Sequence, residues 1–337
     1  MKMRFLGKAG IKVSELCFGT MTFGGSGYWK AIGALGQKEA DKLVGIALEG
    51  GINFFDTADV YSDGVAEELL GKALGGRRKD IILATKVRGR IGPGPNDIGL
   101  SRHHIIEGCH ASLKRLGTDH IDLYQVHSFD PATPLEETLG ALDDLVRQGK
   151  VRYIGCSNYS GWQLMKALAI SEKRNLERFV TLQAYYSLIA RDLEHELVPL
   201  CLDQGMGILP WSPLGGGFLT GKYRRGQPRP QGSRRSDPER QFLQFDEGRG
   251  FDIVDELDRI AKAHGATVTQ AALNYLLRKP VVTSIVIGAR TPEQLADELK
   301  TSDWEMTAEE ISRLEELSKP PRVYPYWMLD FGRQERT

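Results

Sequence analysis

The feature that most constrains the fold is a regular alternation of short apolar runs and amphipathic helical stretches along the whole chain. Short apolar runs of this kind are typical of buried parallel strands, and the helical stretches are typical of the crossovers that connect them. Because eight runs occur, the pattern predicts an α/β fold of the (β/α)8 TIM-barrel type. Strands are expected at residues 15–19, 52–56, 81–85, 121–126, 151–157, 180–184, 207–211 and 284–288.

Three segments lie outside this alternation. Residues 1–14 contain two short alternating runs about a glycine-containing turn, which predicts an N-terminal β-hairpin that caps the bottom of the barrel. Residues 223–250 are polar and arginine-rich, as expected of a mobile loop, and residues 320–337 form a C-terminal tail. We interpret residues 1–337 as one domain with long loops at the C-terminal face of the barrel, where such loops shape active sites.

A doubly wound sheet that binds a dinucleotide is the alternative fold for alternating strands and helices. That fold predicts a GxGxxG fingerprint between a strand and a helix, and the sequence contains none. The segments GPGPND, GMGILP and GGGFLT each fail at the final glycine. A nicotinamide cofactor would therefore have to be held in some other way.

Four polar residues lie at or just past the ends of three expected strands: Asp56, Tyr61, Lys86 and His127. In a parallel barrel the carboxyl ends of the strands share one face, so these side chains are expected to converge there. Each residue taken singly has an ordinary structural interpretation, as a cap, a half-buried aromatic or a core histidine. The four together favour a catalytic site.

The four side chains suit proton transfer to a carbonyl oxygen. A free tyrosine has a pKa near 10, so it donates its proton more readily at neutral pH if that pKa falls. At an effective dielectric of about 20, two unit charges about 4 Å apart interact by about 4 kcal/mol, so the Lys86 ammonium could lower the pKa of Tyr61. We expect Asp56 to hold Lys86, Tyr61 to donate the proton and His127 to orient the substrate oxygen.

The charge balance and the cysteines narrow the class of partner. Forty-four basic residues balance 44 acidic ones, so no net field favours nucleic acid or an anionic membrane, and a small molecule is expected instead. We expect neither a secretory signal nor a membrane span, and no metal site, because the HELVP segment at His195 has Pro199 where a zinc helix needs its second histidine. Four widely spaced cysteines predict a reduced, cytoplasmic protein.

Six segments, taken in order, resemble the aldo-keto reductase family over essentially the whole chain: FFDTADVYSDGVAEELLGKAL, ILATK, IDLYQVH, RYIGCSNYS, LQAYYSLI and PWSPLGGGFLTGKY. The resemblance implies a (β/α)8 barrel in which NADPH lies extended across the barrel mouth without a Rossmann domain. It also implies that Asp56, Tyr61, Lys86 and His127 form a catalytic tetrad.

The cofactor site is expected along the later strand ends. By the resemblance, Ser157, Asn158 and Gln183 hold the nicotinamide amide, and Trp211 stacks on the nicotinamide ring. The glycine run after the seventh strand can supply backbone N–H groups to a pyrophosphate, with Lys222 as a countercharge. The remaining residues assigned to the cofactor are Thr20, Met21, Asp56, Ser212, Pro213, Leu214, Gly215, Gly216, Gly217, Gly288, Arg290, Gln294 and Glu298.

Arg290, at the start of a helix, could pair with a 2′-phosphate and so favour NADPH over NADH. The resemblance adds Gln294 and Glu298 as contacts to the adenosine end. The chain departs from the family pattern there, because position 298 usually carries asparagine and here carries Glu298 beside Asp297.

Substrate contacts are predicted from Trp29, Tyr61, His127 and Phe129. Further walls are expected from Tyr28, from residues 88–99, and from the tail aromatics Tyr324, Tyr326 and Trp327. The loop arginines Arg224, Arg225, Arg229, Arg234 and Arg235 are expected either to fold over the cofactor or to remain solvated.

These observations predict an NADPH-dependent reductase of an aldehyde or ketone. Three alternatives stay open. One is an NAD(P)-dependent sugar or alcohol dehydrogenase that works in the opposite direction. Another is a cofactor-sensing subunit of a membrane channel, and the third is a phosphosugar-handling barrel without nicotinamide. The sequence leaves the oligomeric state and the physiological substrate open.

Overall fold

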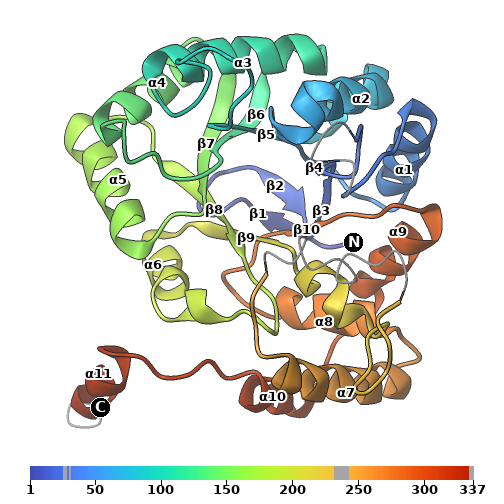
Figure 1. The fold of residues 1–337 in the computed structure, drawn as a ribbon. Helices are drawn as coiled ribbons and strands as arrows, with labels where there is room; N and C mark the ends of the chain where they lie inside the picture. The colour runs from blue at the N-terminus through green and yellow to red at the C-terminus, as the bar shows by residue number, and fades with distance from the viewer. Residues whose placement is uncertain (26–28, 30–31, 231–242, 334–337) are drawn as a thin grey trace.

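Eight parallel strands surround a central axis in this computed structural model, which describes residues 1–25, 29, 32–230 and 243–333 (Figure 1). The strands follow the order β10-β3-β4-β5-β6-β7-β8-β9. A bridge between Ile208 and Val282 nearly closes the ring, with the amide of Ile208 donating to the carbonyl of Val281 at 2.8 Å. The predicted (β/α)8 barrel is confirmed. Its strands are β3 Leu16–Gly19, β4 Phe54–Asp56, β5 Ile82–Val87, β6 Ile121–Val126, β7 Val151–Ser157, β8 Phe179–Tyr185, β9 Gly207–Trp211 and β10 Ile285–Ile287.

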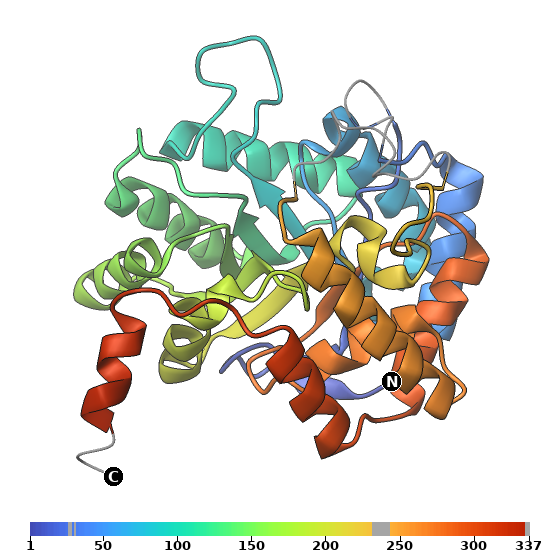
Figure 2. The same cartoon turned by 60° about the horizontal axis from the view of Figure 1, so that its bottom comes forward.

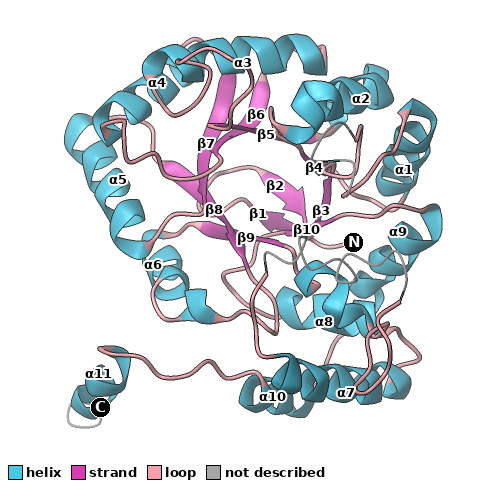
Figure 3. Cartoon of the chain, in the orientation of Figure 1, coloured by secondary structure: helices cyan, strands magenta, loops and turns pink. Residues whose placement is uncertain are grey.

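Helices form a ring outside the strands (Figure 3). Several begin at a residue whose hydroxyl accepts a hydrogen bond from the first turn, such as Ser101 before α3 and Thr291 before α9, where Pro292 is the first helical residue. The described helices are α1 Gln37–Glu49, α2 Val65–Leu74, α3 Arg102–Leu116, α4 Leu135–Arg147, α5 Gly161–Arg174, α6 Leu197–Gln204, α7 Glu247–Ala263, α8 Val268–Leu277, α9 Pro292–Leu299, α10 Ala308–Leu317 and α11 Tyr326–Arg333. None of the helices in the described ranges is long and apolar enough to cross a membrane.

The barrel interior is built in layers, because side chains two residues apart on a strand point to the same face. Phe54, Ala84, Leu123 and Leu209 belong to one buried apolar cluster inside the barrel. Two residues further along the same strands stand Asp56, Lys86, Gln125 and Trp211. The barrel therefore carries an apolar layer below and a polar layer at the C-terminal ends of its strands.

The N-terminal hairpin closes the lower end of the barrel, as predicted. Strands β1 (Met3–Phe5) and β2 (Lys12–Ser14) pair antiparallel, and the turn between them buries Leu6 completely in the apolar cluster. Arg4 fixes the hairpin to the body, because its guanidinium donates to the carbonyls of Leu277 and Val282, each at 2.9 Å.

The arginine-rich segment and the tail contact other elements. Arg224 and Arg225 form ion pairs with Asp258 and Asp252 of α7 at 3.1 and 2.6 Å, and residues 247–250, predicted as loop, form the first turn of that helix. Arg234 and Arg235 lie outside the described residues. The tail runs along the outside of the barrel to α11, while the loop at 88–99 projects from the molecule (Figure 2).

We predict that Leu6→Ala lowers the free energy of unfolding by about 2–5 kcal/mol, because it leaves a cavity where a buried side chain fills the barrel bottom. Urea unfolding followed by circular dichroism measures the change. Met3→Ala is the matched control, since Met3 lies on the same hairpin and is half exposed. Equal losses in the two variants would show that the hairpin does not plug the barrel.

Candidate active site

A buried lysine organises the polar layer. Lys86, near the end of β5, is fully buried, and its ammonium donates to Asp56 Oδ1 at 2.5 Å and to the carbonyl of Thr57 at 2.8 Å. Its third neighbour is the hydroxyl of Tyr61 at 3.3 Å. Burial by itself would lower the pKa of Lys86, but the carboxylate of Asp56 and the phenol of Tyr61 raise it above its ordinary value. The lysine therefore remains charged.

The second oxygen of Asp56 is held by two amides. Gln183 Nε2 donates to Asp56 Oδ2 at 2.9 Å, and Gln125 Nε2 donates to the same oxygen at 3.1 Å. Gln183 was predicted as a cofactor contact and also lines the cavity described below. Gln125 was missed, although its spacing of two residues from the buried Leu123 on β6 placed it on the inward face of the barrel.

Tyr61 and His127 stand together above the lysine. Tyr61 begins a short 3₁₀ turn at Tyr61–Gly64, and its ring meets His127 edge-on with centroids 5.8 Å apart. Trp29 also packs edge-on against the Tyr61 ring, with centroids 5.1 Å apart. The structure thus brings together all four members of the predicted quartet, with Trp29 beside them.

The electrostatics differ from the sequence-based expectation for Tyr61. Burial raises the pKa of the phenol more than the Lys86 ammonium lowers it, so the net pKa lies above its ordinary value rather than below. For His127, burial and the charges of Lys86 and Arg88 all act in one direction and lower the pKa to about 3. At neutral pH both the phenol and a neutral imidazole can donate a hydrogen bond.

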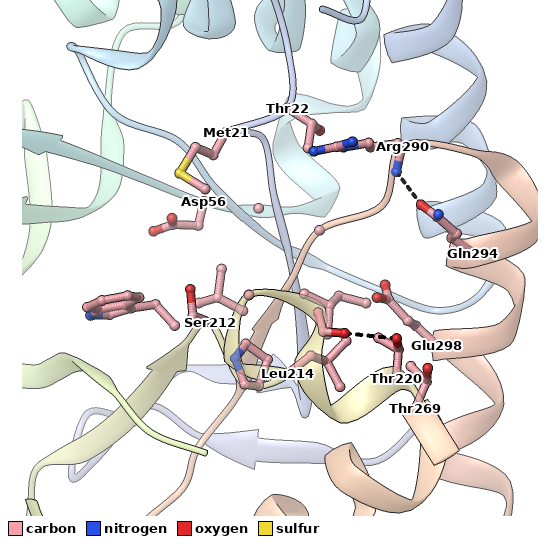
Figure 4. A pocket seen from close by; sticks show the side chains of 18 of the residues that line it. Met21, Thr22, Asp56, Ser212, Leu214, Thr220, Thr269, Arg290, Gln294 and Glu298 are labelled. Carbon is pink, nitrogen blue, oxygen red and sulfur yellow. Dashed lines mark hydrogen bonds between the residues drawn. The ribbon is translucent and has the colours of Figure 1, made fainter. Parts of the chain in front are cut away.

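A cavity of about 540 Å³ opens over this layer and extends from Asp56 to Glu298 on α9 (Figure 4). Most of the predicted site residues line it. They are Met21, Trp29, Asp56, Tyr61, His127, Ser157, Asn158, Gln183, Trp211, Ser212, Pro213, Leu214, Gly216, Gly217, Lys222, Gly288, Arg290, Gln294 and Glu298. Lys86 lies beneath its floor. Seven further lining residues were not predicted: Gly19, Thr22, Thr220, Thr269, Val286, Ile287 and Asp297. Of these, Thr220 lies within the segment PWSPLGGGFLTGKY and could have been found from it.

Some predicted residues lie elsewhere. Among the described residues, Thr20, Gly215 and Phe129 do not line the cavity: Thr20 donates to the carbonyl of Asp56, and Phe129 packs edge-on against Tyr159. Of the tail aromatics, Tyr326 stacks on His195, 5.0 Å between centroids, and Tyr324 and Trp327 also lie away from the cavity. Residues 88–99 contribute nothing to its lining, and Tyr28 falls outside the described residues.

Asn158 ties two cavity residues together. Its backbone is left-handed, at φ 55°, a conformation that asparagine tolerates better than most residues. Its Nδ2 donates to the carbonyl of His127 at 3.0 Å, and its Oδ1 accepts from the indole of Trp211 at 3.1 Å. The Trp211 ring also stacks on Tyr185, with centroids 4.9 Å apart. Asn158 therefore fixes the positions of His127 and Trp211.

The loop after β9 is a tight, glycine-rich turn that lines the cavity. Gly215, Gly216 and Gly217 all have positive φ, between 57° and 88°, and Ser212 lies at φ 49°. Successive residues of this kind are tolerated because glycine has no Cβ. The N–H groups of Gly215 and Gly217 donate within the turn to the carbonyls of Ser212 and Leu214, at 2.9 and 3.0 Å, so these two do not provide the backbone N–H groups expected for a pyrophosphate. Lys222 lines the cavity just beyond this loop.

Comparisons with known proteins agree with this geometry. The model of the aldo/keto reductase family matches residues 15–319. "Uncharacterized oxidoreductase YrpG" of Bacillus subtilis is 39% identical over 95% of this chain and 97% of that protein. "Versiconal hemiacetal acetate reductase" of Aspergillus parasiticus is 34% identical over 96% of this chain and 99% of that protein. "Probable voltage-gated potassium channel subunit beta" of Arabidopsis thaliana is 36% identical over 97% of this chain and 100% of that protein.

A nearly closed (β/α)8 barrel with a tyrosine, a lysine and a carboxylate at its mouth is the architecture of a barrel oxidoreductase. The chain belongs to the aldo/keto reductase family.

We predict that the His127 imidazole stays neutral from pH 8 to pH 5, because its pKa is lowered to about 3. Protonation of His127 is disfavoured in the folded state but not in the unfolded chain. Lowering the pH below the ordinary imidazole pKa of about 6.5 therefore destabilises the folded protein. Carbon–proton correlation spectra would follow the ring, with its signal assigned from its loss in His127→Gln. A titration midpoint near pH 6.5 for the His127 ring would contradict its buried environment.

Proposed function

We propose that this chain reduces an aldehyde or ketone to the alcohol with NADPH, and that Tyr61 donates the proton. The single observation that carries the proposal is the Tyr61 hydroxyl 3.3 Å from a buried ammonium that is itself paired with Asp56, at the floor of a large cavity. A buried ion pair is costly unless its remaining groups are satisfied, and such pairs with a neighbouring titratable group are typical of active sites.

The lining residues fit an extended nicotinamide dinucleotide, which supplies the hydride when bound. Trp211 offers a flat face for the nicotinamide ring, and Ser157, Asn158 and Gln183 stand around it. Lys222, beside the glycine turn at 212–217, offers a positive charge for the pyrophosphate, and Gly288 and Arg290 lie before the N-terminus of α9. This fit supports a cofactor held by the barrel mouth.

The protein's own groups each have a defined part in the proposed reaction. Tyr61 gives its hydroxyl proton to the carbonyl oxygen as negative charge develops there. Lys86 stabilises the phenolate that results, and Asp56 holds the ammonium in place. His127, neutral because of its low pKa, donates a hydrogen bond to the same oxygen and orients it. Trp29, edge-on to the ring of Tyr61, forms the adjacent substrate wall.

The opposite reaction, oxidation of a sugar or alcohol by NAD(P), uses the same groups in reverse. Rates with NADPH and 4-nitrobenzaldehyde, set against rates with NADP and aldoses, distinguish the two directions; activity with the aldoses alone would overturn the direction proposed. The four cysteines are all free and buried, which supports the reducing cytoplasm as the location.

A second candidate is a cofactor-sensing subunit of a membrane channel. It is favoured by the relative named as a potassium channel beta subunit, which the chain matches over its full length. Both candidates need a bound dinucleotide, so binding does not separate them. Negligible turnover over a broad carbonyl screen, together with co-purification of a membrane protein, would favour the sensor; rapid turnover without a partner would favour the reductase.

We predict that Tyr61→Phe reduces carbonyl turnover at least about a hundredfold, since it removes the proton donor, and leaves NADPH affinity within about threefold. Steady-state kinetics give the first value and quenching of tryptophan fluorescence the second. Tyr159→Phe is the matched control: Tyr159 is also buried, and its hydroxyl has no hydrogen-bond partner among the described residues. Retained turnover in Tyr61→Phe would mean that another group supplies the proton.

We also predict that Arg290→Ala weakens NADPH binding by about tenfold and NADH binding little, because the lost guanidinium would pair with the 2′-phosphate. Titrations of both cofactors measure the difference. Arg174→Ala, an exposed arginine on α5, serves as control. Equal losses for the two cofactors would place the 2′-phosphate elsewhere.

A further inference from the structure

Glu298 is a buried acid inside the candidate cofactor cavity. It lies on α9, is only 5% exposed and lines the end of the cavity away from Asp56, where Figure 4 shows it projecting from the helix. Its Oε2 is buried and makes no hydrogen bond with any described residue. A buried carboxyl without a partner is costly, so this oxygen points to a ligand that completes its hydrogen bonding.

The charges around Glu298 do not neutralise it. Asp297 beside it is an acid, whose oxygens accept from Thr267 and Gln270 and so tie α9 to α8. No described lysine or arginine donates a hydrogen bond to the buried Oε2 of Glu298. The further charged or titratable groups that line this cavity are Asp56, Tyr61, His127, Lys222 and Arg290. Those on the elements packed against α9 are Lys38, Glu39, Asp41, Lys42 and Glu49 on α1, Tyr275 on α8, and Lys300 and Asp303 after α9.

Burial and the charge of Asp297 raise the pKa of Glu298 to about 8. At neutral pH its carboxyl is therefore mostly protonated, and a protonated carboxyl has one O–H donor and one carbonyl acceptor. That is the hydrogen-bonding pattern of an amide. Above pH 8 the group becomes an acceptor only and brings a second negative charge next to Asp297.

This chemistry limits which part of a dinucleotide can face Glu298. The phosphates need cations, and the described cationic side chains that line the cavity are Lys222 and Arg290. An acid cannot face a phosphate at low cost. Two uncharged parts of the nucleotide half both donate and accept hydrogen bonds, the ribose hydroxyls and the adenine edge. In NADPH the ribose carries the 2′-phosphate proposed to pair with Arg290, which an acid disfavours. The adenine edge, with an amino group beside a ring nitrogen, is therefore the better match for the carboxyl of Glu298.

We propose that the proton on Glu298 is part of the nucleotide site: the neutral carboxyl pairs with the adenine edge, donating to a ring nitrogen and accepting from the amino group. Dinucleotide affinity then falls as pH rises, because binding requires that proton. This inference rests on the proposed function, since it presupposes a dinucleotide in the cavity.

Titrations of NADPH and NADH by tryptophan fluorescence quenching at pH 7 and pH 9 test the proposal on the full chain. We expect the dissociation constant of the wild type to rise about tenfold over this range, the limit for loss of one required proton with a pKa near 8. Glu298→Gln, which keeps both donor and acceptor, should bind about as tightly at both pH values. Glu293→Gln, an exposed acid on the same helix, should retain the wild-type dependence.

A second measurement does not depend on any variant. Calorimetry of NADH binding to the wild type at pH 8.5, in two buffers of different ionisation enthalpy, should show proton uptake, and nicotinamide mononucleotide, which lacks adenine, should show none. Binding at pH 7 without uptake at pH 8.5, or an equal pH dependence in Glu298→Gln, would overturn this inference and leave the proposed function intact. Failure of either dinucleotide to bind at pH 7 would overturn both.

Discussion

The ion pair between Lys86 and Asp56 is the interaction on which the site depends. An ammonium with no exposed surface is stable only where acceptors surround it, and β4 and the turn after it supply two, the Asp56 carboxylate and the Thr57 carbonyl. The carboxylate then needs donors for its second oxygen, which Gln125 and Gln183 provide from two other strands. The buried charge of Lys86 thus requires polar side chains at the ends of four strands, β4, β5, β6 and β8, and the barrel brings those ends together.

The same burial changes what the lysine does to its neighbours. From sequence, a nearby ammonium implied a more acidic tyrosine, but desolvation of the phenol outweighs that attraction and the pKa of Tyr61 is raised. Tyr61 must be protonated to act as the proton donor. Once the proton has left, the Lys86 ammonium stabilises the resulting phenolate of Tyr61. The lysine therefore contributes to the proposed reaction after proton transfer begins, which is compatible with a raised pKa in the free protein.

Sequence predicted what depends on local pattern and strand order. The eight strands, the hairpin and the positions of Asp56, Lys86 and His127 follow from apolar runs and their ends, and each strand was placed to within a few residues. Long-range packing was harder to predict. Gln125 looked like part of an apolar run, Phe129 packs edge-on against the buried Tyr159, and Tyr326 stacks on His195 rather than reaching the cavity. A local sequence pattern does not indicate which distant part of the fold a loop or tail side chain will contact.

Two carboxyl groups in one cavity illustrate how environment sets chemistry. Asp56 meets an ammonium and two amides, so its charge is matched on both oxygens. Glu298 is buried to a similar degree but has an acid beside it and an oxygen without a partner, which raises its pKa. Burial alone therefore does not decide whether a carboxyl is charged; the donors around it do. The cavity consequently has an ionic end beneath Tyr61 and, at neutral pH, a largely neutral hydrogen-bonding group at its other end.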